Sequence, residues 1–285
     1  MRGELGDSAM NDTQSMLDRS AVVTGGGYNI GRAVALRLAQ EGARVTVFGR
    51  RQAPLDETVA AIEAAGGEAL AVAGDVCAAE DCARLAEAAQ ARFGPVDALA
   101  AIAGGSGAER AVDEVDPAAW AEVVAVNLVG TFHAARAVLP QMKARGGGAI
   151  VTTCGGGSWF PVVGAHATAY AAAKAGVCRF TDQLAVEVMG HGVRVNCLQP
   201  GQVWSPEKLR QVEAEEQRTG APDPGRAANH PPEHAAELAA FLLSDASAPL
   251  TGRIASVDED WWRDPSQVQA VSQSLHAYCL RRVDG

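Results

Sequence analysis

The sequence of 285 residues lacks long apolar runs, an excess of basic charge and any C-x-x-C motif. No apolar run reaches the roughly eighteen residues that a membrane-spanning helix needs, and residues 1–18 lack the apolar core of a signal peptide. The formal net charge of -10 repels phosphates, which argues against nucleic-acid and anionic-membrane partners. We therefore expect a cytoplasmic protein that binds neither membranes nor nucleic acids.

The cysteines form no recognisable motif. Six of them are scattered along the chain, and no His/Cys pattern typical of a metal site accompanies them; they stand at positions 77, 82, 154, 178, 197 and 279. Unpaired, scattered cysteines are typical of a reducing compartment, so we expect neither disulfides nor a metal.

Short apolar runs rich in β-branched residues alternate with helical runs rich in Ala, Leu and Glu. The predicted strands cover 21–25, 44–49, 69–76, 96–105, 148–153, 193–201 and 253–258, and the predicted helices 30–42, 55–67, 79–93, 117–144, 167–191 and 232–244. Alternation of apolar strands with helices predicts an α/β protein: a single-domain, doubly wound Rossmann fold whose parallel sheet has helices on both faces.

This domain is expected to span residues 19–260. Residues 1–18 are polar and patternless, which indicates a flexible N-terminal leader. Residues 202–231 are polar, with Pro and Gly clustered at 221–225, and are expected to form a lid. Residues 261–285 form a C-terminal extension with a helix-like pattern, which would either cover a neighbouring subunit or cap the pocket.

The segment "TGGGYNIGR" joins the first predicted strand to the first predicted helix. Glycines there let the backbone approach a pyrophosphate, whose charge is stabilised by the helix N-terminus. Asn29 stands where a further glycine is usual, and Asn tolerates positive φ. The expected dinucleotide contacts from this turn are Gly25, Gly27, Tyr28, Asn29, Ile30 and Gly31; the alternative is an ordinary glycine-rich loop.

The end of the second predicted strand indicates which dinucleotide binds. An acid there would bind the ribose 2′-hydroxyl of NAD(H), whereas a base would bind the 2′-phosphate of NADP(H). Here Gly49 stands at the acid's place and is followed by Arg50 and Arg51, whose guanidinium groups suit a phosphate. NADP(H) is favoured, with NAD(H) as the alternative, and the two arginines would otherwise be ordinary solvated side chains.

Together these segments resemble the short-chain dehydrogenase/reductase family over about residues 19–260. "TGGGYNIG" matches its TGxxxGxG turn except at Asn29, "VNLVG" its helix-four asparagine at Asn127, and "YAAAK" its YxxxK motif at Tyr170 and Lys174. The resemblance implies further coenzyme contacts at Asp75 and Val76 of "GDV", Ala103 and Gly104 of "AIAG", and Pro200, Gly201, Val203 and Ser205 of "PGQVWS". It also implies a homodimer or homotetramer built through helices 117–144 and 167–191.

The resemblance implies that Tyr170 donates or accepts the proton, that Lys174 holds the coenzyme ribose and that Asn127 anchors a water chain. Tyrosine has a pKa near 10, and a nearby ammonium together with oxidised nicotinamide would lower it. Taken alone, Tyr170 and Lys174 would be a helix surface pair, and Asn127 a buried residue that ties helix to strand.

The chain departs from the family pattern at two places, in the active-site segment "VTTCGGGSWF" and at the end of the fourth predicted strand. Gly155 occupies the position of the family's catalytic serine, and "AIAG" replaces NNAG. Ser158 is the first candidate for the missing hydroxyl, because the run Gly155–Gly157 is flexible enough to carry it into the site. Cys154 is a weak hydrogen-bond donor and is better explained as a small buried apolar residue. The alternative is that no side-chain hydroxyl of this kind acts.

We expect an NADP(H)-dependent oxidoreductase that interconverts a ketone and a secondary alcohol on a small or medium-sized metabolite, cyclic ones included, as in secondary metabolism. The candidate substrate contacts are Trp159, Phe160, His166 and Trp204. One alternative is redox-neutral chemistry such as epimerisation, dehydration or cyclisation, for which the missing serine argues. Another is a catalytically silent binding subunit, against which the joint presence of Tyr170, Lys174 and Asn127 argues.

Overall fold

A seven-stranded, entirely parallel sheet forms the centre of the molecule, in the order β3-β2-β1-β4-β5-β6-β7. The computed structural model describes residues 15–107, 109–162 and 166–280. The strands are β1 (Ser20–Thr24), β2 (Arg44–Gly49), β3 (Glu68–Ala73), β4 (Ala98–Ala101), β5 (Gly148–Thr153), β6 (Val193–Gln199) and β7 (Ile254–Ser256). The strand order reverses between β1 and β4, and such switch points of parallel sheets bind ligands.

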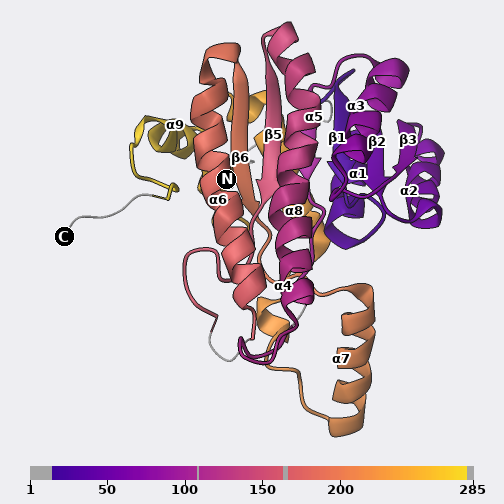
Figure 1. Cartoon of the computed structure of the whole chain (residues 1–285), viewed down its shortest axis with the longest axis vertical. Helices are drawn as coiled ribbons and strands as arrows, with labels where there is room; N and C mark the ends of the chain where they lie inside the picture. The colour runs from indigo at the N-terminus through magenta and orange to yellow at the C-terminus, as the bar shows by residue number, and fades with distance from the viewer. Residues whose placement is uncertain (1–14, 108, 163–165, 281–285) are drawn as a thin grey trace, which may run out of the picture.

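Helices cover both faces of this sheet, as the alternating sequence pattern predicts. They are α1 (Asn29–Gln40), α2 (Gln52–Ala64), α3 (Ala79–Phe93), α4 (Pro117–Val124), α5 (Gly130–Arg145), α6 (Thr168–Val188), α7 (Pro206–Thr219), α8 (Pro232–Leu243) and α9 (Pro265–Gln273). One apolar core packs α1, α2 and α8 on the sheet, and a second packs α3, α5 and α6 on the opposite face. Figure 1 looks onto the face covered by α5 and α6.

The helix predicted over 117–144 is interrupted. A π-helical turn, Ala125–Val129, separates α4 from α5 and contains the buried Asn127. An 18-residue window within the stretch 117–145 has a mean hydropathy of 1.4, so by length and composition alone this stretch could cross a membrane. Its contacts with α3, α6, β4 and β5 identify it as part of the helical layer on the sheet, where such composition is ordinary.

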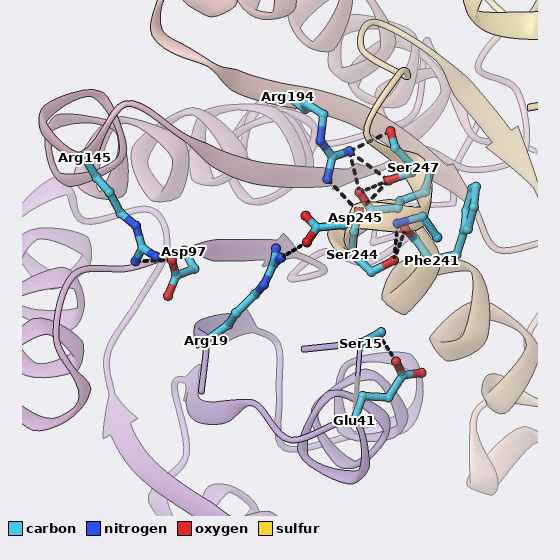
Figure 2. A network of polar contacts seen from close by, with 12 residues as sticks. Ser15, Arg19, Glu41, Asp97, Arg145, Arg194, Phe241, Ser244, Asp245 and Ser247 are labelled. Atoms are coloured by element: carbon cyan, nitrogen blue, oxygen red, sulfur yellow. Dashed lines mark hydrogen bonds and ion pairs between the residues drawn. The ribbon is translucent and has the colours of Figure 1, made fainter. Parts of the chain in front are cut away.

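Arg194 ties β6 to the end of α8 at the edge of the sheet where the strands begin (Figure 2). Its guanidinium donates to the carbonyls of Leu242, Ser244 and Ser247 over 2.9 to 3.2 Å, and to Ser247 Oγ at 2.8 Å. Leu242 lies in the last turn of α8 and Ser244 and Ser247 follow the helix, and the Ser247 hydroxyl also donates to Leu242 O at 2.9 Å and to Ser244 O at 3.1 Å. Burial lowers the pKa of Arg194 to about 10, and the bonds compensate for that burial.

The folded domain extends beyond both of the boundaries expected for it, residues 19 and 260. Met16 belongs to the segment predicted as a leader, yet it is fully buried in the core and its N–H donates to Glu41 O at 3.0 Å. Trp261 and Trp262, the start of the predicted extension, are each only 5% exposed. Met16, Trp261 and Trp262 are therefore part of the folded core, because they bury large apolar side chains.

The segment predicted as a lid, residues 202–231, contains α7. Figure 1 shows α7 extending away from the sheet. The two ends of the segment meet in a bridge between Gln202 and Asn229, and Glu216 of α7 accepts two hydrogen bonds from Arg226. The segment is thus a helical arm with a closed base rather than an irregular loop.

Candidate active site

A cavity of about 340 Å³ opens at the carboxyl ends of β1 to β4, at the switch point of the sheet. Twelve of the predicted coenzyme contacts line it: Gly25, Gly27, Tyr28, Asn29, Ile30, Gly31, Arg50, Arg51, Asp75, Val76, Ala103 and Gly104. It is also lined by Gly49, Pro54, Leu55, Gly74, Ile102 and Val126, which the sequence analysis did not name as coenzyme contacts. Gly49, Gly74 and Ile102 adjoin predicted contacts, whereas Pro54, Leu55 and Val126 carried no sequence signal.

The glycine turn is shaped by close backbone contacts. A β-carbon on Gly31 would lie 2.1 Å from Gly25 O, so only glycine lets the first turn of α1 approach the loop. Gly25 has a φ of +71° and Asn29 a φ of +44°, as expected for an Asn that replaces glycine. The N-terminus of α1 therefore faces the cavity and offers backbone N–H groups to an anion.

Arg50 and Arg51 stand at the exposed rim of this cavity. The Arg51 guanidinium lies over the ring of Tyr28, 4.6 Å from its centroid. Arg50 has no carboxylate partner among the residues that the structure describes. Of the two arginines, Arg50 is thus the one whose guanidinium is available to a bound phosphate.

Asn127 and Lys174 meet at Gly104, at the end of the cavity next to β4. A β-carbon on Gly104 would lie 2.5 Å from Asn127 Oδ1 and 3.3 Å from Lys174 Nζ. The Asn127 amide donates to Gly105 O and Val123 O, both at 2.8 Å, and accepts from Gly105 N at 3.2 Å. The Asn127 side chain thus ties the π-helical turn to the end of β4.

Lys174 is 4% exposed and donates from Nζ to Thr153 O at 2.8 Å. Its ammonium lies 5.6 Å from the centroid of the Tyr170 ring. Burial lowers the pKa of Lys174 and raises the pKa of Tyr170 to about 12. The protein's own residues therefore do not produce the lowering of the Tyr170 pKa that we expected, because burial of the phenol raises it.

Tyr170 occupies the space beside Gly155, where the family's serine would stand. A β-carbon on Gly155 would lie 2.3 Å from Tyr170 Oη. Ser158 is 6% exposed; its hydroxyl donates to Gly155 O at 2.6 Å and accepts from Gly155 N at 3.2 Å. The predicted substitute hydroxyl is close to the serine position, but it is engaged by the backbone of the loop.

Cys154 is buried, as predicted for a small apolar residue, and its thiol lies 3.4 Å from Leu198 O. Sequence analysis missed its neighbours. The thiols of Cys178 and Cys197 come close to it from α6 and β6. No spacing pattern connects these three positions, because they are brought together only by strand pairing and helix packing.

The predicted contacts that follow β6 do not line the cavity. Pro200 is buried, and Gly201 and Val203 are partly buried. The Ser205 hydroxyl caps α7 by accepting from Lys208 N at 3.1 Å. One bond links this segment to the glycine turn: the Asn29 amide donates to Trp204 O at 3.4 Å.

The four predicted substrate contacts divide among separate places. Trp159 and Phe160 are about half exposed and pack edge to face, with ring centroids 5.9 Å apart. Trp204 is partly buried beside Gly225, and His166 is exposed. Trp159 borders a second cavity of about 340 Å³, lined by Trp159, Ile254, Ser256, Glu259, Tyr278, Cys279 and Leu280.

The chain is similar over most of its length to proteins named as dehydrogenases and reductases. The family model described as short chain dehydrogenase matches residues 19–216. Cis-4-hydroxycyclohexanecarboxylate dehydrogenase of Sinomonas cyclohexanicum is 38% identical over 86% of this chain and 97% of its own length. Levodione reductase of Leifsonia aquatica is 32% identical over 86% of this chain and 95% of its own length. A crystal structure of actinorhodin polyketide ketoreductase with NADPH superposes with a TM-score of 0.74 and 33% identity, covering 83% of this chain and 94% of that one.

Proposed function

Because the chain belongs to the short-chain dehydrogenase/reductase family and is thus an oxidoreductase, we propose that it interconverts a ketone and a secondary alcohol with NADP(H) and with Tyr170 as the proton donor and acceptor. The observation that carries the proposal is the convergence of Lys174, Asn127 and the coenzyme cavity at Gly104, with the Tyr170 ring beside Lys174. General acid–base chemistry needs a positioned proton donor next to the redox partner.

The cavity fits a dinucleotide phosphate. The glycine turn and the N-terminus of α1 would hold the pyrophosphate, and Arg50 would hold a 2′-phosphate, which favours NADP(H) over NAD(H). When bound, the coenzyme supplies or accepts a hydride. The fit is supported by the close packing of Gly31 against Gly25, which brings the N-terminus of α1 to the cavity.

Tyr170 donates its proton to the substrate oxygen during ketone reduction. With a pKa of about 12 the phenol stays protonated at neutral pH, as a proton donor must. Lys174 is held by Thr153 O, so its ammonium is fixed next to the Tyr170 ring and stabilises the phenolate that remains after transfer. Asn127 keeps the end of β4 in place beside them.

We infer that Tyr170, rather than Ser158, is the principal side-chain donor to the substrate oxygen. Ser158 would first have to break its two bonds to Gly155. This argument revises the catalytic role expected for Ser158 into a role in holding the loop beside Tyr170.

A cyclic ketone or alcohol is the substrate class we favour. Cis-4-hydroxycyclohexanecarboxylate dehydrogenase and levodione reductase, both similar to this chain over most of their lengths, are named for cyclic compounds. The half-exposed rings of Trp159 and Phe160 stand on the loop that carries Gly155 and offer apolar surface to such a ring.

The test is coenzyme-dependent turnover of cyclohexanone-type ketones, followed through NADPH absorbance in the wild type and two variants. Tyr170→Phe should lower kcat by about 10²- to 10⁴-fold, because it removes the general acid. Ser158→Ala should lower kcat by less than about tenfold. A loss of about 10²-fold or more in Ser158→Ala would instead assign that hydroxyl to the transition state.

Two results would contradict the proposed function itself. One is full activity of Tyr170→Phe. The other is conversion of the substrate without any change in NADPH or NADH, which would favour redox-neutral chemistry on this fold.

A further inference from the structure

Three buried thiols converge next to the active-site loop. Cys154 follows β5, Cys178 lies in α6 and Cys197 lies in β6; their Sγ atoms are all within 4.8 Å of one another. Each side chain is at most 1% exposed. The Cys154 thiol donates to Leu198 O at 3.4 Å, and Leu128, Ile254 and Leu280 pack around the three side chains.

We propose that Cys154, Cys178 and Cys197 form a binding site for a thiophilic divalent metal ion of the Zn²⁺ class. Zn²⁺ binds thiolate sulfur at about 2.3 Å in a tetrahedron, which places ligating sulfurs about 3.8 Å apart. The sulfurs need to move by no more than about 1 Å to reach that spacing. Soft thiolate ligands select Zn²⁺ and its heavier analogues over Mg²⁺ and Ca²⁺.

The charge at this place favours a divalent ion. Lys174 is one helical turn before Cys178 and interacts electrostatically with all three thiols. When the ion binds, the three thiols release their protons to solvent. The three thiolates, one divalent cation and the Lys174 ammonium then carry no net charge together. A buried group of charges is tolerated when it is balanced in this way, whereas a monovalent ion would leave a negative charge in an apolar environment.

The hydroxyl of Ser158 offers a fourth ligand. It is buried near the Cys178 thiol, and to bind an ion it would give up its hydrogen bond to Gly155 O. No His or carboxylate joins the three thiols in the part of the chain that the structure describes. Structural zinc sites are closed by four ligands, so an oxygen from Ser158 would complete the coordination.

An ion can reach the cluster through the glycine run. Gly155, Gly156 and Gly157 follow Cys154 directly, and Gly156 is exposed. Glycine has the widest range of backbone conformations, so this part of the loop can open without side-chain clashes. The site does not depend on the proposed enzymatic reaction, because none of the three thiols has a role in it.

The experiment uses the full-length protein, reduced and stripped with a chelator, and titrates it with Cd²⁺ as a spectroscopic analogue of Zn²⁺. Thiolate-to-cadmium charge-transfer absorbance reports sulfur ligation, and Zn²⁺ competition reports affinity. The matched control is Cys77→Ala/Cys82→Ala/Cys279→Ala, which removes the cysteines outside the cluster. The test variant is Cys178→Ala, and thermal unfolding checks that each variant is folded.

We expect charge-transfer absorbance that saturates at one equivalent of Cd²⁺ per chain in the wild type and in the control. We expect Cys178→Ala to lose most of this absorbance and to bind Zn²⁺ at least about tenfold more weakly. The proposal is overturned if the control shows no saturable absorbance, or if folded Cys178→Ala keeps it. If Cys178→Ala does not fold, the control alone decides, because its only thiols are the three of the cluster.

Discussion

Restoring the family's serine at position 155 should impair this protein. A β-carbon there would lie 2.3 Å from Tyr170 Oη, 3.0 Å from Cζ and 3.2 Å from Cε1. Ordinary contacts of this kind begin near 3.4 Å, so the ring would have to move by about 1 Å. The backbone at Gly155 is not the obstacle, because its φ lies outside the left-handed region.

The cost has two parts. Overpacking of this size lowers the free energy of unfolding by about 1–3 kcal/mol. A displacement of about 1 Å in a catalytic group lowers turnover by about 10²-fold. Gly155→Ser should therefore lose both stability and activity, although it adds the hydroxyl that related enzymes use.

Two controls separate the β-carbon from the hydroxyl and from the flexibility of the loop. Gly155→Ala adds the same carbon and should lose as much as Gly155→Ser. Gly156→Ser should behave like the wild type, because its nearest neighbour would be Val162 Cγ2 at 3.6 Å. Urea unfolding gives the stability and NADPH-coupled ketone reduction gives kcat. Unchanged stability together with a raised kcat in Gly155→Ser would refute the reasoning.

Four further expectations concern the coenzyme, the fold, the assembly and the titration of the site. Arg50→Ala should weaken NADPH binding relative to NADH binding by about tenfold or more, as for a lost bond to a charged group. Arg51→Ala should change the ratio of the two affinities little, and tryptophan fluorescence titrations measure both. An unchanged affinity ratio in Arg50→Ala would exclude a role of Arg50 in binding the 2′-phosphate. Arg194→Met should lower the free energy of unfolding in urea by about 1.5–3 kcal/mol, because it removes the charged hydrogen bonds that join β6 to the end of α8; a cost below about 0.5 kcal/mol would contradict this. Phe132 is 43% exposed on α5, so Phe132→Glu should convert the expected dimer or tetramer into a monomer by light scattering; a wild-type protein that is already monomeric would disprove the assembly. Tyr170 has a folded pKa of about 12 against about 10 in the unfolded chain, so the folded state keeps a proton that the unfolded state has lost. Stability should thus fall from pH 10 to pH 12, and the fall should be smaller in Tyr170→Phe; equal falls in both proteins would show that another group titrates.

The layers of the fold could be predicted from the sequence because the signals for them are local. Apolar strands alternate with helices, and the glycine turn stands between a strand and a helix, so the parallel sheet and its first ligand-binding turn could be predicted from neighbouring residues. The π-helical turn at Asn127 could not, because the surrounding periodicity reads as a continuous helix. That turn depends on bonds to Gly105, which comes from another element.

The burial of Met16, Trp261 and Trp262 also could not be predicted from neighbouring residues, because these side chains belong to segments that look like tails in the sequence. A polar or irregular segment is predicted to be flexible unless the space that its few apolar side chains fill in the core is known. The gap is created by other elements, so only the folded chain shows that these side chains fill it.

The conformation of the active-site loop depends on both neighbouring and distant residues. Gly155 alone reads as a lost serine and suggests a weakened enzyme, yet in the structure the missing side chain is what allows Tyr170 to occupy that space. The bonds of Ser158 to Gly155 and the packing of Cys154 against Cys178 and Cys197 then hold the loop in a shape that a serine-bearing loop would not share. The conformations of Cys154, Gly155 and Ser158 are therefore mutually dependent, and replacing Gly155 alone by the family's serine should not restore the family's geometry.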